Sequence, residues 1–348
     1  MKKAENIIVG ISIGDLNGIG SEVVLKTFED SRMLELCTPV IFANVKLLSF
    51  VKKSFQSTSL LHGIDKLDQI VLGKINVLNL WKEGVDLNLG KDDSKAGEYA
   101  IKSFIAATKA LKEGVIDVLV TAPINKFNIQ SDDFKFPGHT DYLDQELEGN
   151  ALMLMVQDNL RIGLLTDHIP LSEVASQLTE ELIVRKIETV RQTLIKDFGI
   201  NKPKIAVLGL NPHCGDGGVI GTEDDLIIKP TLKKMFDKGI LVFGPFAADG
   251  FFGSNQYEKY DAVIATYHDQ GLIPFKTLSF GKGVNYTAGL HKIRTSPDHG
   301  TAYDIAGKGI ADFNSFKEAV YLAIDIYHSR NQYAEISKKP LKTKEKQL

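Results

Sequence analysis

Short apolar runs alternate along the chain with segments whose apolar residues recur at helical spacing. The runs are rich in Val, Ile and Leu and end at turn residues, which is typical of buried strands in a parallel sheet. Strands are predicted over 7–13, 40–43 and 118–121, and helices over 21–28, 96–113 and 180–198. In the last of these helices, Thr179 can cap the start and Gly199 can end it. The alternation predicts an α/β fold.

Three of the apolar runs end in a histidine. They cover 162–168, 205–213 and 262–268, and they end at His168, His213 and His268. Ligands of open α/β sheets bind just beyond the carboxyl ends of the strands. Three imidazoles and one open coordination position suit a catalytic metal ion. One histidine at a strand end would carry little meaning, but three at equivalent positions predict a metal centre. Three imidazoles favour zinc or cobalt over magnesium and leave manganese open.

Composition and charge restrict the class of protein. The chain has 348 residues, of which 43% are hydrophobic and 24% charged, as expected for a globular enzyme large enough for two domains. A net charge of -3 provides no electrostatic footprint for nucleic acid or an anionic membrane. No run approaches the ~18 apolar residues of a spanning helix, and Cys37 and Cys214 support no disulfide framework. We therefore predict a cytoplasmic protein with neither nucleic-acid nor membrane partners.

A glycine-rich stretch follows the second of these histidines. Gly215, Gly218 and Gly221 would let backbone amides approach a cofactor pyrophosphate. Thr222 and Asp225 form a capping-box pattern that predicts the start of a helix. Alternatively, the glycines build only a tight strand-to-helix turn. The dinucleotide fingerprint G-x-G-x-x-G is absent from the chain, so a nicotinamide cofactor would bind by another route.

Two further groups of residues suggest ligand binding. In the loop 298–310, Asp304, next to Ile305, could accept hydrogen bonds from ribose hydroxyls and repel a 2′-phosphate, which favours NAD over NADP. The second group provides cations and polar groups for a phosphate or carboxylate. It consists of His139, Thr140, Lys276, Asn285 and Arg294. From spacing alone, ordinary charged surface loops explain this second group equally well. Asp249 and Asp269 could orient a metal ligand or accept a proton.

Taken together, these stretches resemble the 4-hydroxythreonine-4-phosphate dehydrogenase family of the vitamin B6 pathway, from Gly10 to about Ala311. The first-half motifs are Gly14-Asp15…Gly18-Ile19-Gly20…Glu22, Thr121-Ala122-Pro123-Ile124-Asn125-Lys126 and Gly138-His139-Thr140-Asp141. The second-half motifs are Thr166-Asp167-His168, Asn211-Pro212-His213, Tyr267-His268-Asp269-Gln270-Gly271 and Asp298-His299-Gly300-Thr301-Ala302. The last loop also resembles the adenosine-binding loop of isopropylmalate dehydrogenases.

The resemblance implies a two-domain fold of the isocitrate/isopropylmalate dehydrogenase type with the active site in the cleft between domains. The first α/β domain would comprise residues 1–130 plus 300–348, and the second, residues 131–299, would carry the metal ligands and the homodimer interface. The active site would be shared between subunits. The three histidines would bind one divalent metal ion, and the group from His139 to Arg294 would bind substrate. Asp249 and Asp269 would support catalysis.

The implied reaction is an NAD- and metal-dependent oxidation of 4-phosphohydroxy-L-threonine to 2-amino-3-oxo-4-phosphooxybutanoate. This product would decarboxylate to 3-amino-2-oxopropyl phosphate in pyridoxal phosphate biosynthesis. Departures from the family pattern at Leu16-Asn17, Ser21, Asp141 and Asp216 leave 4-phospho-D-threonate and 4-phospho-D-erythronate open as substrates. A metal-dependent hydrolase or lyase is an alternative that would need no NAD. A non-catalytic sensor of a phosphorylated metabolite is another.

Overall fold

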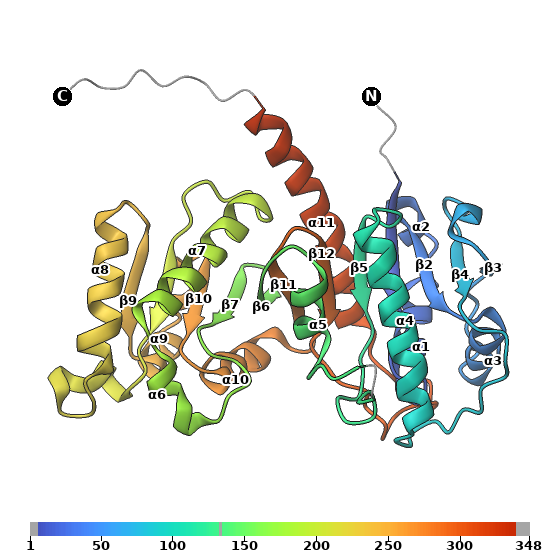
Figure 1. The fold of residues 1–348 in the computed structure, drawn as a ribbon, viewed down its shortest axis with the longest axis horizontal. Coiled ribbons are helices and arrows are strands. Elements are labelled where there is room, and N and C mark those ends of the chain that lie inside the picture. Colours follow the sequence, from blue (N-terminus) through green and yellow to red (C-terminus); the bar gives the residue numbers. More distant parts are fainter. Residues whose placement is uncertain (1–5, 132–133, 339–348) are drawn as a thin grey trace.

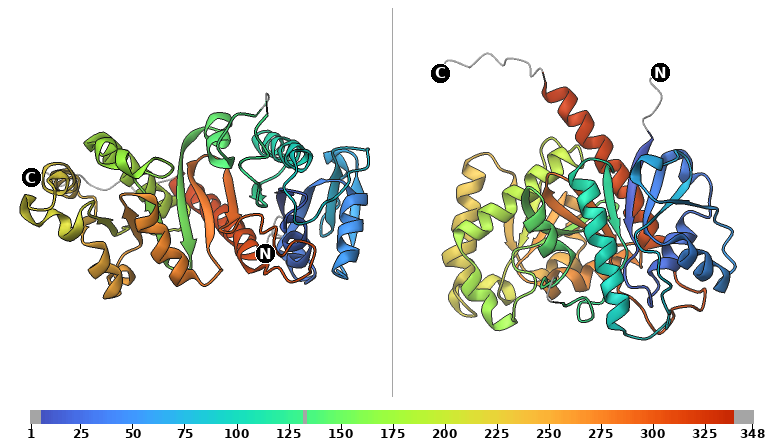
Figure 2. Two further views of the ribbon diagram at one scale, coloured as in Figure 1. Left: turned by 90° about the horizontal axis from the view of Figure 1, so that it is seen from below. Right: turned by 45° about the vertical axis from the view of Figure 1, so that its right-hand side comes forward.

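A single mixed β-sheet runs the length of the molecule, with helices on both of its faces (Figures 1 and 2). The computed structural model describes residues 6–131 and 134–338. Within them, twelve strands follow the order β3-β4-β2-β1-β5-β12-β11-β6-β7-β10-β8-β9. The strands are β1 (Ile7–Ser12), β2 (Cys37–Ala43), β3 (Leu61–Ile64), β4 (Ile75–Asn79), β5 (Val118–Thr121), β6 (Gly149–Gln157), β7 (Leu160–Leu164), β8 (Ile205–Leu208), β9 (Val242–Phe246), β10 (Ala262–Ala265), β11 (Val284–Leu290) and β12 (Ile293–Pro297).

The helices pack their apolar faces on this sheet, which buries the central strands completely. Val9, Ile11, Val118 and Val120 of β1 and β5 have no exposed surface. The helices are α1 (Gly20–Thr27), α2 (Met33–Leu36), α3 (Val45–Ser54), α4 (Ser94–Lys112), α5 (His139–Glu146), α6 (Val174–Gln177), α7 (Glu180–Lys196), α8 (Lys229–Asp237), α9 (Ala248–Gly253), α10 (His268–Ser279) and α11 (Asn314–Ser337). Shorter helical turns are η1 (Leu67–Gln69), η2 (Leu171–Glu173), η3 (Pro212–Gly218), η4 (Asp224–Ile228) and η5 (Gln256–Lys259). None of the helices in the described ranges is long and apolar enough to cross a membrane.

Two parallel blocks of strands make up the sheet. The block β3-β4-β2-β1-β5-β12 and the block β7-β10-β8-β9 are each parallel. Antiparallel pairing of β11 with β12 and β6, and of β6 with β7, joins the two blocks. The predicted α/β fold is confirmed. The pairing of β12 with β5 joins two strands that the predicted division assigns to different domains. The division at residues 130/131 and 299/300 stays a prediction.

The predicted strands and helices are all found. Thr179 caps α7 by accepting a hydrogen bond from the amide of Leu182 at 3.2 Å, and Gly199 ends this segment with φ +68°. The helix start that the Thr222–Asp225 pattern predicts is confirmed, because Glu223 is already helical and the amide of Leu226 donates to the carbonyl oxygen of Thr222 at 2.8 Å. The reciprocal capping box itself does not form, because the amide of Thr222 donates to the carboxylate of Glu223 at 3.1 Å and not to Asp225.

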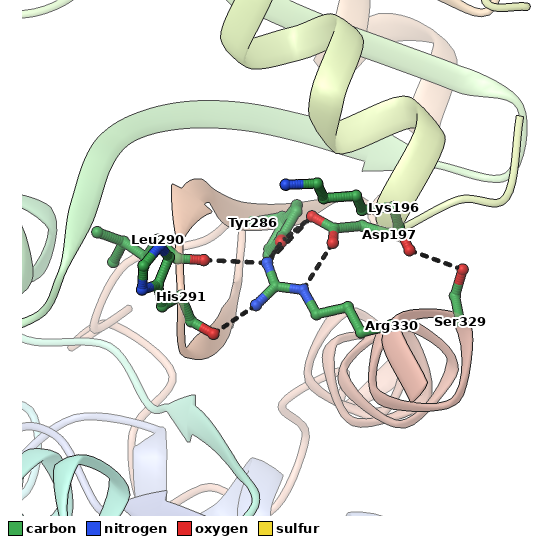
Figure 3. A network of polar contacts seen from close by, with 7 residues as sticks. All are labelled: Lys196, Asp197, Tyr286, Leu290, His291, Ser329 and Arg330. Atoms are coloured by element: carbon green, nitrogen blue, oxygen red, sulfur yellow. Dashed lines mark hydrogen bonds and ion pairs between the residues drawn. The ribbon is translucent and has the colours of Figure 1, made fainter. Parts of the chain in front are cut away.

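An ion pair with a buried carboxylate fastens α11 to the end of α7 and to the β11–β12 hairpin (Figure 3). The Nε of Arg330 lies 2.6 Å from Oδ1 of Asp197, and the Tyr286 hydroxyl donates to Oδ2 of Asp197 at 2.5 Å. The same guanidinium donates to the carbonyl oxygens of Leu290 at 3.1 Å and His291 at 2.7 Å. The contacts therefore connect three segments that are far apart in the sequence.

Replacing Arg330 with Met should lower the free energy of unfolding by about 3–5 kcal/mol, because it leaves a buried carboxylate without its cation. The Asp197 side chain is only 3% exposed. Urea unfolding of the variant measures the loss. The matched control is Arg32→Met, which removes the pair with Asp30, whose side chains are 82% and 46% exposed; that change should cost about 1 kcal/mol at most. Equal losses of unfolding free energy in both variants would show that the ion pair between Arg330 and Asp197 stabilises the fold no more than an exposed pair does.

Candidate active site

A cavity of about 300 Å³ lies beside the carboxyl ends of β5 and β12, near the middle of the sheet. Its walls come from these strand ends, from β6 and β11, from the start of α5 and from α10. All five residues predicted to bind substrate line it: His139, Thr140, Lys276, Asn285 and Arg294. They are spread over more than 150 residues of sequence, and the fold brings them together. Ordinary charged surface loops, the alternative explanation for these residues, would not be expected to meet at one cavity.

Arg294 is the most buried charge in this cavity. It lies on β12 with 2% of its surface exposed. Its Nε and Nη2 donate to the Thr121 hydroxyl at 3.1 and 2.6 Å, and Nη1 donates to the Thr287 hydroxyl at 3.0 Å. These partners are neutral, and burial lowers the pKa of Arg294 to about 9. A buried cation without an acidic partner is unfavourable unless an anion joins it, so the site is suited to an anionic ligand.

Three buried polar atoms around the cavity have no hydrogen-bond partner within the described residues: His139 Nε2, Asn285 Oδ1 and His299 Nε2. A buried polar group without a partner costs free energy, so these atoms favour a polar ligand. Burial, helped by the charges of Arg294 and Lys126, lowers the pKa of His139 well below its usual range. His139 is therefore neutral at pH 7 and can serve as a hydrogen-bond donor or acceptor.

Lys126 and His299 line the cavity although the sequence does not single them out as site residues. Lys126 follows β5, and His299 follows β12. Ligands of open α/β sheets bind just beyond the carboxyl ends of the strands, and this strand-end rule also predicts the three histidines. Applied to every strand, the rule would have found Lys126 and His299 as well. Lys276 from α10 also points to this region, since its Nζ donates to the carbonyl oxygen of Asp298 at 3.2 Å. The cavity thus combines three cations with neutral donors and acceptors.

The predicted metal ligands follow three adjacent parallel strands, because β10 lies between β7 and β8. The rings of His168 and His268 have centroids 5.7 Å apart. Two imidazoles at this separation can reach one ion, because Zn–N bonds are about 2.0–2.1 Å long. Nδ1 of His268 is 2.7 Å from Oδ1 of Asp269, which leaves Nε2 for a ligand. Burial, with a contribution from the charge of Lys126, lowers the pKa of His168, which favours the neutral form that binds metals.

His213 does not join the other two histidines. Its side chain is exposed, and it begins a run of left-handed residues in η3 that extends to Gly218. In residues 6–131 and 134–338, no three His, Cys, Asp or Glu side chains are grouped closely enough to hold a metal ion. His168 and His268 thus fit a divalent metal by their chemistry and spacing. The set of three ligands stays a prediction.

The two predicted acids occupy different places. Asp269 is in the first turn of α10 and contacts His268, so it can orient that ring. Asp249 is exposed on α9 and is not among the residues that line the cavity. Its predicted part in catalysis therefore gains no support from the geometry.

The predicted cofactor residues lie in two loops. In the first, a Cβ added at Gly221 would come within 2.6 Å of the Asn211 amide, and one at Gly215 within 2.6 Å of the Gly221 carbonyl. These glycines allow the loop to pack against itself, as expected for the tight-turn alternative. In the second loop, His299 and Gly300 line the cavity, and Asp304 and Ile305 follow, with Asp304 exposed. This loop leads directly out of the cavity and is the better placed of the two for a cofactor.

Comparisons with known proteins show what this chain is similar to. Residues 35–323 match the family model described as pyridoxal phosphate biosynthetic protein PdxA. The chain is 47% identical to a 4-hydroxythreonine-4-phosphate dehydrogenase of Bacteroides thetaiotaomicron, over 97% of this chain and 93% of that protein. It is 35% identical to a provisionally named D-threonate 4-phosphate dehydrogenase of Oceanobacillus iheyensis, over 92% and 97%. The crystal structure of 4-hydroxythreonine-4-phosphate dehydrogenase from Klebsiella pneumoniae matches with a TM-score of 0.79 and 32% identity, covering 94% of this chain and 99% of that one.

Proposed function

Because the chain belongs to the PdxA family of pyridoxal phosphate biosynthetic proteins, we propose that this oxidoreductase oxidises 4-phosphohydroxy-L-threonine in the cavity beside β5 and β12. Its activity is that of a 4-hydroxythreonine-4-phosphate dehydrogenase in pyridoxal phosphate biosynthesis, and its family implies a nicotinamide cofactor. The observation that carries the choice of cavity is Arg294, a buried cation whose hydrogen-bond partners among residues 6–131 and 134–338 are neutral hydroxyls. A phosphate group would neutralise it.

The cavity would bind such a substrate in two ways, by pairing charges and by forming hydrogen bonds. Arg294, with Lys276 and Lys126, neutralises the phosphate. His139 and Asn285 satisfy their unpartnered atoms on the polar groups of the substrate. The cations and the neutral imidazole therefore orient the substrate and hold its phosphate without requiring a proton transfer.

The carbon to be oxidised would lie toward His168 and His268. A divalent metal held by these histidines, for which zinc is our proposal, would lower the pKa of the substrate alcohol and favour loss of carbon dioxide. NAD would accept the hydride, and Asp304 would favour it over NADP by contacting the ribose. Asp269 orients His268, and we keep it as the candidate proton acceptor. We further propose a homodimer whose subunits share the site.

The test is NADH formation by the purified protein with 4-phosphohydroxy-L-threonine, 4-phospho-D-threonate and 4-phospho-D-erythronate, each with and without a chelator. We expect chelator-sensitive NADH from the first substrate. A preference for 4-phospho-D-threonate would instead support a second candidate function, which the 35% identical relative from Oceanobacillus iheyensis favours. Failure of all three substrates in metal-replete buffer would overturn the proposal.

A further inference from the structure

The glycine-rich turn between β1 and α1 packs directly against the loop 298–311. The amide of Ile19 donates to the carbonyl oxygen of Thr301 at 3.0 Å. Gly18 is so close to Thr301 that an added Cβ would come within 2.8 Å of that oxygen. In many nucleotide-binding folds the turn after the first strand cradles phosphates. Here the same position is filled by a loop of the protein itself, which explains why glycines occur without the dinucleotide fingerprint.

Helix α1 holds the far end of the same loop. The carboxylate of Glu22, which is 3% exposed, accepts the amide of Ala311 at 2.8 Å. The ammonium group of Lys26 donates to the carbonyl oxygens of Gly309 and Ala311 at 2.9 and 3.1 Å, and it pairs with Glu22 at 2.8 Å. The loop is therefore fixed at both ends, while Asp304 between them stays exposed.

Asp15 is the centre of the contacts at the near end. It is completely buried. It accepts hydrogen bonds from the Tyr303 hydroxyl at 2.8 Å, from the Asn128 side chain at 2.7 Å and from the amide of Asn17 at 2.9 Å. Burial, together with the hydrogen bond to Asp15, raises the pKa of Tyr303, so its hydroxyl stays protonated and donates.

Asp15 also connects this loop to the wall of the cavity. Its amide donates to the carbonyl oxygen of Pro123 at 2.9 Å, and Pro123 and Lys126 line the cavity. Asn125 donates to the Tyr303 hydroxyl at 3.1 Å from the same segment. Asp15 thus contacts the loop that carries Asp304 through its carboxylate and the segment that carries Lys126 through its backbone amide.

We propose that Asp15, acting through the Tyr303 hydroxyl, is a positioning residue that fixes the loop 298–311 in the conformation that binds NAD. This inference rests on the proposed function, in which Asp304 of this loop contacts the cofactor ribose. Because the loop is already ordered by the protein, binding NAD need not order it, and affinity is gained.

The test is Tyr303→Phe, which removes only the hydroxyl. A hydrogen bond to a charged group corresponds to about a 10- to 100-fold effect, so we expect the dissociation constant and KM for NAD to rise by about 10-fold or more. The KM for the phosphorylated substrate and kcat at saturating NAD should stay within about twofold of the wild type. Hydrogen exchange of the amides between residues 302 and 310 should become faster. Asp15→Asn should produce the same pattern if it folds.

The matched control is Tyr99→Phe on α4, which removes a tyrosine hydroxyl that donates to the exposed carboxylate of Glu83 at 3.2 Å. It should leave all five measured quantities unchanged. Equal NAD affinity of Tyr303→Phe and wild type would overturn the positioning role, as would equal losses in kcat and in both KM values together with a lower Tm, because that pattern marks a structural role. If the wild type itself neither binds NAD nor forms NADH, the proposed function is overturned, and this outcome is distinct from a failure of the positioning role alone.

Discussion

Replacing Arg294 with Met should lower kcat/KM for the phosphorylated substrate by about 10²- to 10⁴-fold and leave the protein at least as stable as the wild type. Removing one partner of a buried charge pair typically costs about 3–5 kcal/mol, and in this variant the partner left without its counter-charge is the phosphate of the ligand. Without ligand, however, Arg294 is a buried cation among neutral hydroxyls. An apolar side chain of similar length removes that desolvation cost. The opposite signs of the two effects separate a binding residue from a structural one.

The measurement combines steady-state kinetics with thermal unfolding in the presence and absence of inorganic phosphate. Phosphate should raise the Tm of the wild type and leave that of the variant unchanged, since a ligand stabilises only a state that binds it. The control is Arg161→Met, because Arg161 is also buried, at 8% exposure, but donates to the carbonyl oxygens of Asn159 and Asp261 outside the cavity. That variant should lose stability and keep kcat/KM. A loss of stability in Arg294→Met with normal kcat/KM would contradict the assignment.

The strand-end rule accounts for most of what the sequence predicts about the site. Parallel strands bring their carboxyl ends to one edge, so His168 and His268 meet because β7 and β10 are neighbours. The periodicity of the apolar residues is local, and it therefore predicts α4 and α7 well. It contains no information about which strands become neighbours. The joining of both blocks into one sheet depends on the pairing of β11 with β12 and β6, which alternation alone does not determine.

Long-range contacts and backbone conformation set the limits of sequence interpretation. Asp15 and Tyr303 are 288 residues apart, so no motif spacing reveals their hydrogen bond. The glycines near Gly221 fit both a phosphate cradle and a tight turn, and the close packing of Gly221 on the Asn211 side chain and of Gly215 on the Gly221 carbonyl favours the turn. Likewise, a left-handed φ of 53° at His213 cannot be read from a histidine in the sequence. Each of these features depends on tertiary packing that a single sequence does not encode locally.

Replacing His213 with Ala should lower kcat by about 10³-fold or more, since a metal that polarises the substrate contributes several kcal/mol of transition-state stabilisation. Its side chain is exposed at the surface of η3, so the free energy of unfolding of the metal-free protein should not change. Steady-state kinetics and urea unfolding check these two results, and the metal content after dialysis shows whether the loss of kcat follows a loss of metal. His291→Ala is the control, because His291 is 71% exposed and pairs with Glu148 outside the cavity.

The outcome decides how the metal site is completed. If His213→Ala loses metal as fully as His168→Ala and His268→Ala do, the ion binds all three histidines. The left-handed run from His213 to Gly218 must then rearrange to bring the third imidazole to the pair, and strained loops at functional sites are suited to such a change. If the variant keeps its metal and a near-normal rate, His168 and His268 are sufficient, and the prediction of three ligands from three strand ends is wrong.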